Sequence, residues 1–89
     1  MEQSNKQFLM QAREKFGLRI VKQPMDGGYM LAIYTKDGQQ IFHEARNEPS
    51  ETAYDIMYPS ARKAVADYFG LYKETIIDGA KYRESYIEL

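Results

Sequence analysis

Apolar and polar positions near the N-terminus repeat with the period of an α-helix. Four apolar side chains share one helical face, at positions i, i+1, i+4 and i+8: Phe8, Leu9, Ala12 and Phe16. Ser4, followed three residues later by Gln7, is a capping-box pattern, which satisfies two backbone N–H groups at a helix start. Gly17 follows the stripe and suits the left-handed backbone that ends many helices. The sequence therefore predicts a helix that begins after Ser4 and ends at Gly17.

Beyond Gly17 the pattern changes to short segments typical of strands. The segments LRIVKQ, YMLAIYT and QIFHEA are separated by PMDGG and KDGQ, which are rich in turn residues. An Asp-Gly pair between two apolar segments is a strong hairpin signal. These features predict a three-stranded antiparallel meander.

The Asp37-Gly38 turn allows two registers between the second and third strands. A two-residue loop pairs Tyr34 with Ile41, whereas a three-residue loop places Gly38 in a bulge. We favour the two-residue loop, in which Ile33 also faces Phe42. One face of the sheet then carries a core: Leu31, Ile33 and Phe42. The opposite face is less polar than a solvated sheet face usually is: Met30, Ala32, Tyr34, Ile41, His43 and Ala45.

The second half of the chain has fewer clear boundaries. After the polar connector ARNEPSE, residues 50–58 fit either a short helix capped by Ser50 or a fourth strand. We place Pro59 in the first turn of the next helix, where its missing N–H costs little. That helix has its own stripe: Ala61, Ala64, Val65, Tyr68, Phe69 and Tyr72. The segment ETIIDGAKYRESYIEL reads as a final helix weakened by Gly79.

Together these elements predict one α+β domain over residues 1–89. It comprises a helix, a three-stranded antiparallel meander and one or two C-terminal helices. The net charge of -1 argues against binding to nucleic acid by bulk charge. The longest apolar run, Tyr29 to Tyr34, is far below the roughly 20 residues of a membrane span. With no cysteine and no signal-peptide pattern, we expect a cytoplasmic protein.

The sequence contains no convincing catalytic constellation. His43 is the only histidine and has no Ser or Cys partner nearby in the sequence for nucleophilic or general-base chemistry. No zinc, calcium or phosphate-binding motif is recognisable. We therefore expect no enzyme, no cofactor and no metal.

Three sets of residues are candidates for binding another protein. The first lies on the less polar sheet face: Met30, Tyr34, Ile41 and His43. The second is an acidic edge with intervals of four, three and four residues: Glu44, Glu48, Glu51 and Asp55.

The third set comes from tyrosines that occur in pairs four residues apart: Tyr54 with Tyr58, Tyr68 with Tyr72, and Tyr82 with Tyr86. We interpret Tyr68 and Tyr72 as core residues with hydroxyls at the rim. We interpret Tyr82 and Tyr86 as an exposed aromatic patch on the final helix.

Two resemblances add expectations. The order helix, three strands, helix, with Arg62 and Lys63 in SARKAVADYFGL at the expected start of the second helix, resembles double-stranded RNA-binding domains. That resemblance implies phosphate contacts from these two cations, although the family's Gly-Pro-x-His loop is missing. The stretch LAIYTKDGQQIFHEARNEPSE resembles small phage anti-CRISPR inhibitors of type II-A nucleases, and it implies a role for the acidic edge.

The function predicted from the sequence is a non-enzymatic protein-binding module. We expect an accessory or inhibitor protein of a phage or mobile element, with a homodimer as one form of partner. The alternative is a nucleic-acid-binding domain of the double-stranded RNA-binding type.

Overall fold

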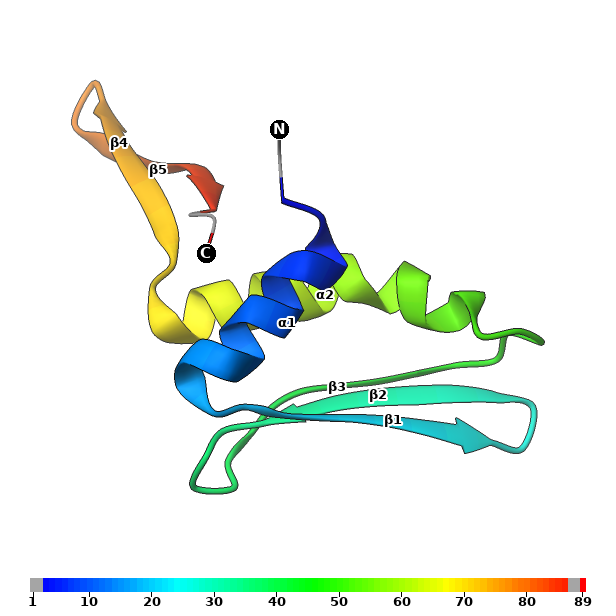
Figure 1. The fold of residues 1–89 in the computed structure, drawn as a ribbon. Coiled ribbons are helices and arrows are strands. Elements are labelled where there is room, and N and C mark those ends of the chain that lie inside the picture. The colour runs from blue at the N-terminus through cyan, green and yellow to red at the C-terminus, as the bar shows by residue number, and fades with distance from the viewer. Residues whose placement is uncertain (1–2, 87–88) are drawn as a thin grey trace.

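Two helices cover one face of a three-stranded sheet, and a separate strand pair projects from the helical side (Figure 1). The computed structural model describes residues 3–86 and Leu89, with the backbone alone for residues 83–86. The elements, in chain order, are α1 (Asn5–Phe16), β1 (Arg19–Met25), β2 (Gly28–Tyr34), β3 (Gln40–Arg46), α2 (Thr52–Phe69), β4 (Tyr72–Ile77) and β5 (Ala80–Tyr86). The predicted α+β class, with its first helix and its meander in the order β1-β2-β3, is confirmed.

Helix α1 begins and ends where its capping residues predict. The Ser4 hydroxyl accepts a hydrogen bond from the Gln7 N–H at 3.1 Å, and the Gln7 side chain accepts one from the Ser4 N–H at 3.0 Å. Gly17 adopts φ 68° and donates its N–H to the carbonyl of Arg13. At the end of the helix Phe16 stacks on Phe69, with ring centroids 4.1 Å apart. Local hydrogen bonds therefore determine both ends of α1.

The β2–β3 loop has three residues, so the favoured two-residue loop is wrong. Thr35 donates its N–H to the Gln39 carbonyl at 2.8 Å, and Gly38 has φ 92°. The Thr35 hydroxyl selects this loop because it donates to the Asp37 carboxylate at 2.6 Å and accepts the Gln39 N–H at 3.0 Å. The hydrogen bond from Thr35 also lowers the pKa of Asp37.

A bulge at Ile41 compensates for the longer loop. Tyr34 pairs with Gln40, not with Ile41 as predicted, and the register shifts between Ile33 and Tyr34. Ile33 still faces Phe42, as predicted. The longer loop shifts the pairing of β3 with β2 by one residue, and the extra residue of the bulge on β3 shifts it back. Phe42 therefore returns to the face that packs on the helices.

Residues 52–58 are helical, and Pro59 lies inside α2 and not in its first turn. A proline in a helix removes one hydrogen bond, here the bond to the carbonyl of Asp55, at a cost of about 3 kcal/mol. Pro59 and Asp55 are both exposed, so water can reach the freed carbonyl. The apolar face continues on both sides of the proline and is buried: Ala53, Tyr54, Met57, Tyr58, Ala61, Val65 and Ala66. Burial of this long face outweighs the local cost of the proline.

The predicted final helix over residues 74–89 is wrong, because residues 72–86 form the antiparallel pair β4–β5. Asp78 and Gly79 have φ of 52° and 81°, and Ile77 pairs with Ala80 across them. Positive φ at both central residues is the geometry of a type I′ turn, which Asp-Gly favours. The β-branched residues before it, Thr75 to Ile77, suit a strand better than a helix.

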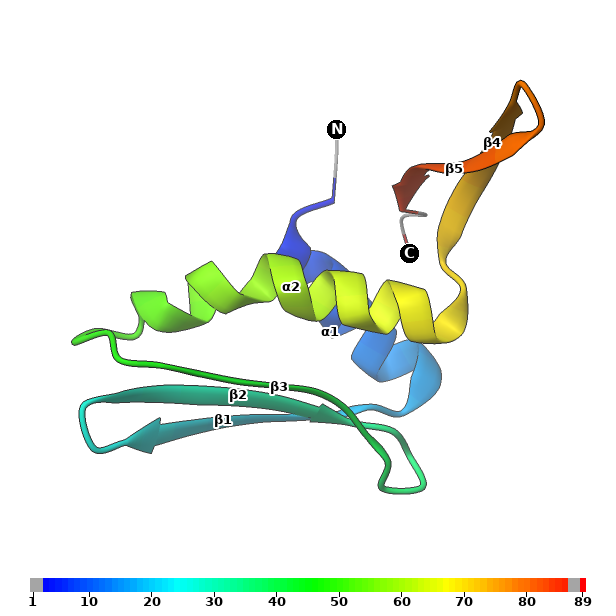
Figure 2. The ribbon, with the colours of Figure 1, turned by 180° about the vertical axis from the view of Figure 1, so that it is seen from behind.

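The core lies between the inner face of the sheet and the two helices. Its largest fully buried side chains come from β2 and both helices: Phe8, Leu9, Leu31, Ile33, Met57 and Val65. Figure 2, the view from behind, shows the sheet on one side of α2 and the strand pair β4–β5 on the other. The strand pair makes few contacts with the rest of the described chain.

We predict that Gly28→Ala destabilises the fold by at least about 2 kcal/mol. A Cβ atom at Gly28 would overlap the carbonyl oxygen of Arg46, where β3 passes close to β2. Urea unfolding followed by circular dichroism measures the loss. Gly27→Ala is the control, because the space around Gly27 is open and only its φ of 77° disfavours a side chain, at about 1 to 2 kcal/mol. Equal losses in the two variants would contradict the proposed overlap.

We predict that backbone amides of β4 exchange with deuterium much faster than those of β2. A two-stranded hairpin with few contacts elsewhere is marginally stable in water, whereas β2 is the central, buried strand. Hydrogen exchange followed by nuclear magnetic resonance (NMR) resolves the two strands in one experiment. Equal protection of β4 and β2 would show that the hairpin is stabilised by more than the described contacts.

Candidate functional site

No element of the described chain covers the side of the sheet that faces away from the helices (Figures 1 and 2). The strand pairing assigns ten side chains to this side, which we call the outer face: Arg19, Val21, Gln23, Met25, Met30, Ala32, Tyr34, Gln40, His43 and Ala45. Apolar side chains run along its centre, and Met25 at one end is 50% exposed. Among these ten residues there is no carboxylate.

The polar residues on the outer face are arranged around the apolar centre. The Arg19 guanidinium lies over the Tyr34 ring, 4.8 Å from its centroid. His43 is exposed and pairs with Ala32, which is fully buried beneath its neighbours. The face therefore combines an apolar strip with one permanent cation and one histidine.

Three of the four residues predicted for the sheet-face site share the outer face: Met30, Tyr34 and His43. Ile41, the fourth, lies at the bulge of β3 and packs against the core. The bulge turns Ile41 away from the regular alternation, and the sequence pattern could not show this.

The structure brings two of the four carboxylates of the predicted acidic edge, Glu51 and Asp55, to one hollow. Glu44 lies opposite Leu31 on the inner side of the sheet, and Glu48 forms an ion pair with Arg46 at 3.7 Å. Glu51 and Asp55 lie at the start of α2. They line a hollow of about 270 Å³ together with Lys6, Lys22, Thr52, Tyr54 and Tyr58. Basic side chains are therefore interleaved with the acidic ones.

The tyrosine pairs have different environments. Tyr54 and Tyr58 belong to the core, with 8% and 7% of their surface exposed. Tyr68, predicted as a core residue, is 47% exposed, and its hydroxyl donates to Gln39 Oε1 at 3.0 Å. Tyr72, predicted to join the same helical stripe, lies in β4 and is half-buried.

The terminal pair belongs to a strand and not to the predicted helix. Tyr82 is 53% exposed on β5, and the Tyr86 side chain lies outside the described part of the structure. Ile76 and Ile77 in β4 are 70% and 54% exposed. The exposed apolar residues of this region therefore come from a hairpin.

Arg62 anchors the N-terminal segment to α2. Its Nη1 donates to the Gln3 carbonyl at 2.8 Å and to Asn5 Oδ1 at 3.3 Å, and its guanidinium lies 4.6 Å from the Phe8 ring centroid. Because α2 begins at Thr52, Arg62 and Lys63 lie in the middle of the helix and do not open it. The predicted placement of two cations at a helix start is therefore wrong.

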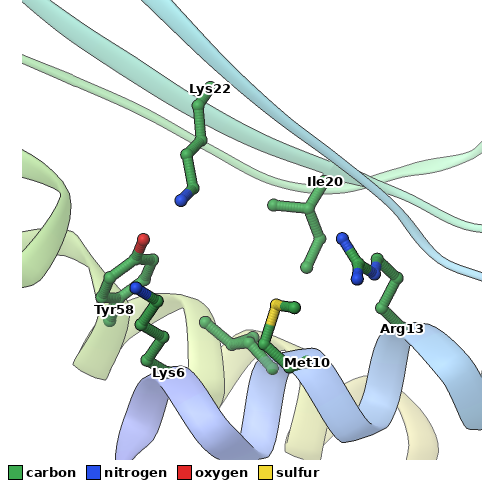
Figure 3. Close-up of a pocket in the computed structure, with 7 residues that line it drawn as sticks. Lys6, Met10, Arg13, Ile20, Lys22 and Tyr58 are labelled. Carbon is green, nitrogen blue, oxygen red and sulfur yellow. The ribbon is translucent and has the colours of Figure 1, made fainter.

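A groove between α1 and β1 was not anticipated from the sequence. It measures about 420 Å³ and is lined by Lys6, Leu9, Met10, Arg13, Ile20, Lys22 and Tyr58 (Figure 3). Lys22 belongs to the inner side of the sheet, and its ammonium group lies 5.5 Å and 5.7 Å from the rings of Tyr54 and Tyr58. The signal in the sequence that could have indicated this groove is Lys22, a lysine at an inward-facing position of β1.

Within residues 3–82 and Leu89, whose side chains are described, no group of three His, Asp or Glu side chains could hold a metal ion. Among the described helices, none is both long enough and apolar enough to cross a membrane. Comparison with protein-family models, with curated proteins and with solved structures found no match to this chain.

Burial raises the pKa of Tyr54, and the carboxylate of Glu51 raises it further. The folded state therefore favours the protonated phenol. The protonated Tyr54 phenol contributes to the stability of the fold. Its contribution is complete below the unfolded pKa of about 10 and is lost as the pH rises through the higher folded pKa.

We predict that Tyr54→Phe loses less stability than the wild type between pH 9 and pH 11, as measured by urea unfolding. Tyr82→Phe, at an exposed tyrosine, is the control and should follow the wild type. An identical alkaline loss in Tyr54→Phe would contradict this assignment.

Proposed function

We propose that this protein is a non-enzymatic binding module that presents the outer face of its sheet to another protein. The observation that carries the proposal is the one-sided packing: α1 and α2 lie on the inner side, and no described element covers the outer face. Contiguous apolar surface of this kind on a small protein is typical of an interaction site.

The charges of the outer face support a partner that carries carboxylates around an apolar patch. Arg19 and His43 flank the apolar strip, and none of the ten residues is acidic. Opposite charges across an interface favour association and select the correct partner. A second copy that docked through the same face would supply no carboxylate to it. A different protein is therefore the better occupant.

Tyr34 and Met30 are the residues expected to contribute most to the affinity. Large side chains near the centre of an interface dominate binding energies, and Tyr, Met and Arg are residue types enriched at interfaces. The Arg19 guanidinium over the Tyr34 ring holds both groups in place before a partner arrives. Less side-chain entropy is then lost on binding.

The proposal includes an accessory or inhibitor role in a phage or mobile element only because residues 31–51 resemble small phage anti-CRISPR inhibitors. The basic side chains beside Glu48, Glu51 and Asp55 add no support for an acidic surface that imitates DNA. RNA binding gains no support either, since Arg62 holds the N-terminal segment.

We predict that a photo-crosslinking amino acid at Ala45 forms an adduct with one specific protein in the native host. The same amino acid at Lys63 should form no such adduct. Ala45 is exposed on the outer face, and Lys63 is exposed on α2. The crosslinked protein is then purified and its binding to the wild type is measured by calorimetry.

Two charge variants at one position test the chemistry of the interface. Ala45→Glu should weaken the reconstituted complex at least about tenfold, because it places a carboxylate opposite carboxylates. Ala45→Lys, of similar size, should weaken it less. Circular dichroism checks that both variants fold. Equal weakening by the two variants would contradict an acidic partner surface. Adducts from Lys63 but not from Ala45 would contradict the outer face as the site.

A further inference from the structure

We propose that the groove between α1 and β1 binds an extended acidic segment of a partner polypeptide. The segment adds as a strand to the free edge of β1 and places a carboxylate side chain among Lys6, Arg13 and Lys22. This site is separate from the outer face, since Lys22 lies on the inner side of the sheet. Its test does not depend on the proposal for the outer face.

Three cations from two different elements converge on the groove. Lys6 and Arg13 come from α1, Lys22 comes from β1, and Figure 3 shows their side chains around one open space. Arg13 contacts the exposed Glu14 at 3.7 Å. Among the described residues, no carboxylate lies within 4.0 Å of Lys6 or Lys22. A group of cations with so few internal partners favours an anionic ligand.

The carboxylates of Glu51 and Asp55 lie in the neighbouring hollow and not in the groove. Glu51 and Asp55 line that hollow together with Lys6 and Lys22, beyond ion-pair distance from both. The groove itself has no acidic lining residue. The rings of Tyr54 and Tyr58 hold the Lys22 ammonium between the two spaces.

The floor of the groove is apolar. Leu9 is 2% exposed, Ile20 is half-buried, and Met10 is 42% exposed. A ligand for this groove therefore combines an apolar part with a negative charge. The volume of about 420 Å³ accommodates a few side chains.

The free edge of β1 favours a polypeptide over a small amphipathic acid. β1 is an edge strand in the order β1-β2-β3, so one side of its backbone has no strand partner within the described chain. Pro24 lies in β1 opposite Tyr29. A proline is tolerated in an edge strand where its missing N–H would face away from the neighbouring strand.

Backbone groups alternate in direction along an antiparallel strand. Ile20 and Lys22 lie four and two residues before Pro24, so their N–H and C=O groups point to the same side of β1 as those of Pro24, which is the free edge. These two residues also line the groove. An added strand could therefore bond to β1 through its backbone while its side chains enter the groove, as in other cases of strand addition.

The test uses the full-length, ¹⁵N-labelled protein and a capped six-residue peptide of alternating Glu and Val. NMR titration should show the largest amide shifts at Ile20 and Lys22. The same peptide with Gln in place of Glu should bind at least about tenfold more weakly, because the charge-assisted hydrogen bonds are lost. A Glu peptide N-methylated on every residue should also fail to bind tightly, because it has no backbone N–H left to donate to β1.

Protein variants locate the charge contacts. Lys22→Gln and Lys6→Gln should each weaken binding of the Glu peptide several-fold, and circular dichroism checks that both variants fold. Lys6 is exposed on α1, so its variant keeps the test informative if Lys22→Gln unfolds. Lys63→Gln makes the same charge change on α2 and should leave binding unchanged.

Several outcomes would overturn the proposal. They are equal binding of the Glu and Gln peptides, equal binding of the N-methylated peptide, equal weakening by Lys63→Gln, or no binding at all. Amide shifts concentrated at His43 and Ala45 would assign acidic peptides to the outer face and would also overturn it.

Discussion

Packing of the inner sheet face against α2 is the interaction on which the rest of the structure depends. Leu31 and Ile33 are fully buried there, and Met57 and Val65 of α2 are fully buried in the same core. A chain of 89 residues has enough apolar surface for one such layer. Because both described helices pack on that side, no helix of the described residues covers the outer face.

The same packing creates the groove. Helix α1 packs mainly on α2, and Arg62 ties the start of α1 to the middle of that helix. Space therefore remains between α1 and the edge strand β1, where Lys22 lies. The two proposed sites have similar chemistry, since each places positive charge beside apolar surface. The net charge of the protein is -1, so the positive character of these two sites depends on where the side chains lie and not on the overall composition.

The elements with strong local signals were predictable. The Ser4 cap and Gly17 defined α1, and the alternating segments defined the meander. The placement of Met30 and Tyr34 on one face of the sheet was also predictable, because side chains in a strand alternate with a two-residue period. The hairpin at Asp78 carried a recognisable turn signal, which the helical spacing of the tyrosines obscured.

The sequence by itself determined where the helix and the meander form, because capping, turn geometry and apolar period act between neighbours in the chain. Only the tertiary structure decided that α2 continues through Pro59, since burial of its long apolar face outweighs a lost hydrogen bond. The bulge that turns Ile41 to the core likewise follows from packing. The groove at Lys22 also follows from packing. It lies between α1 and β1, and the residues of α1, β1 and α2 that line it come together only when the core forms.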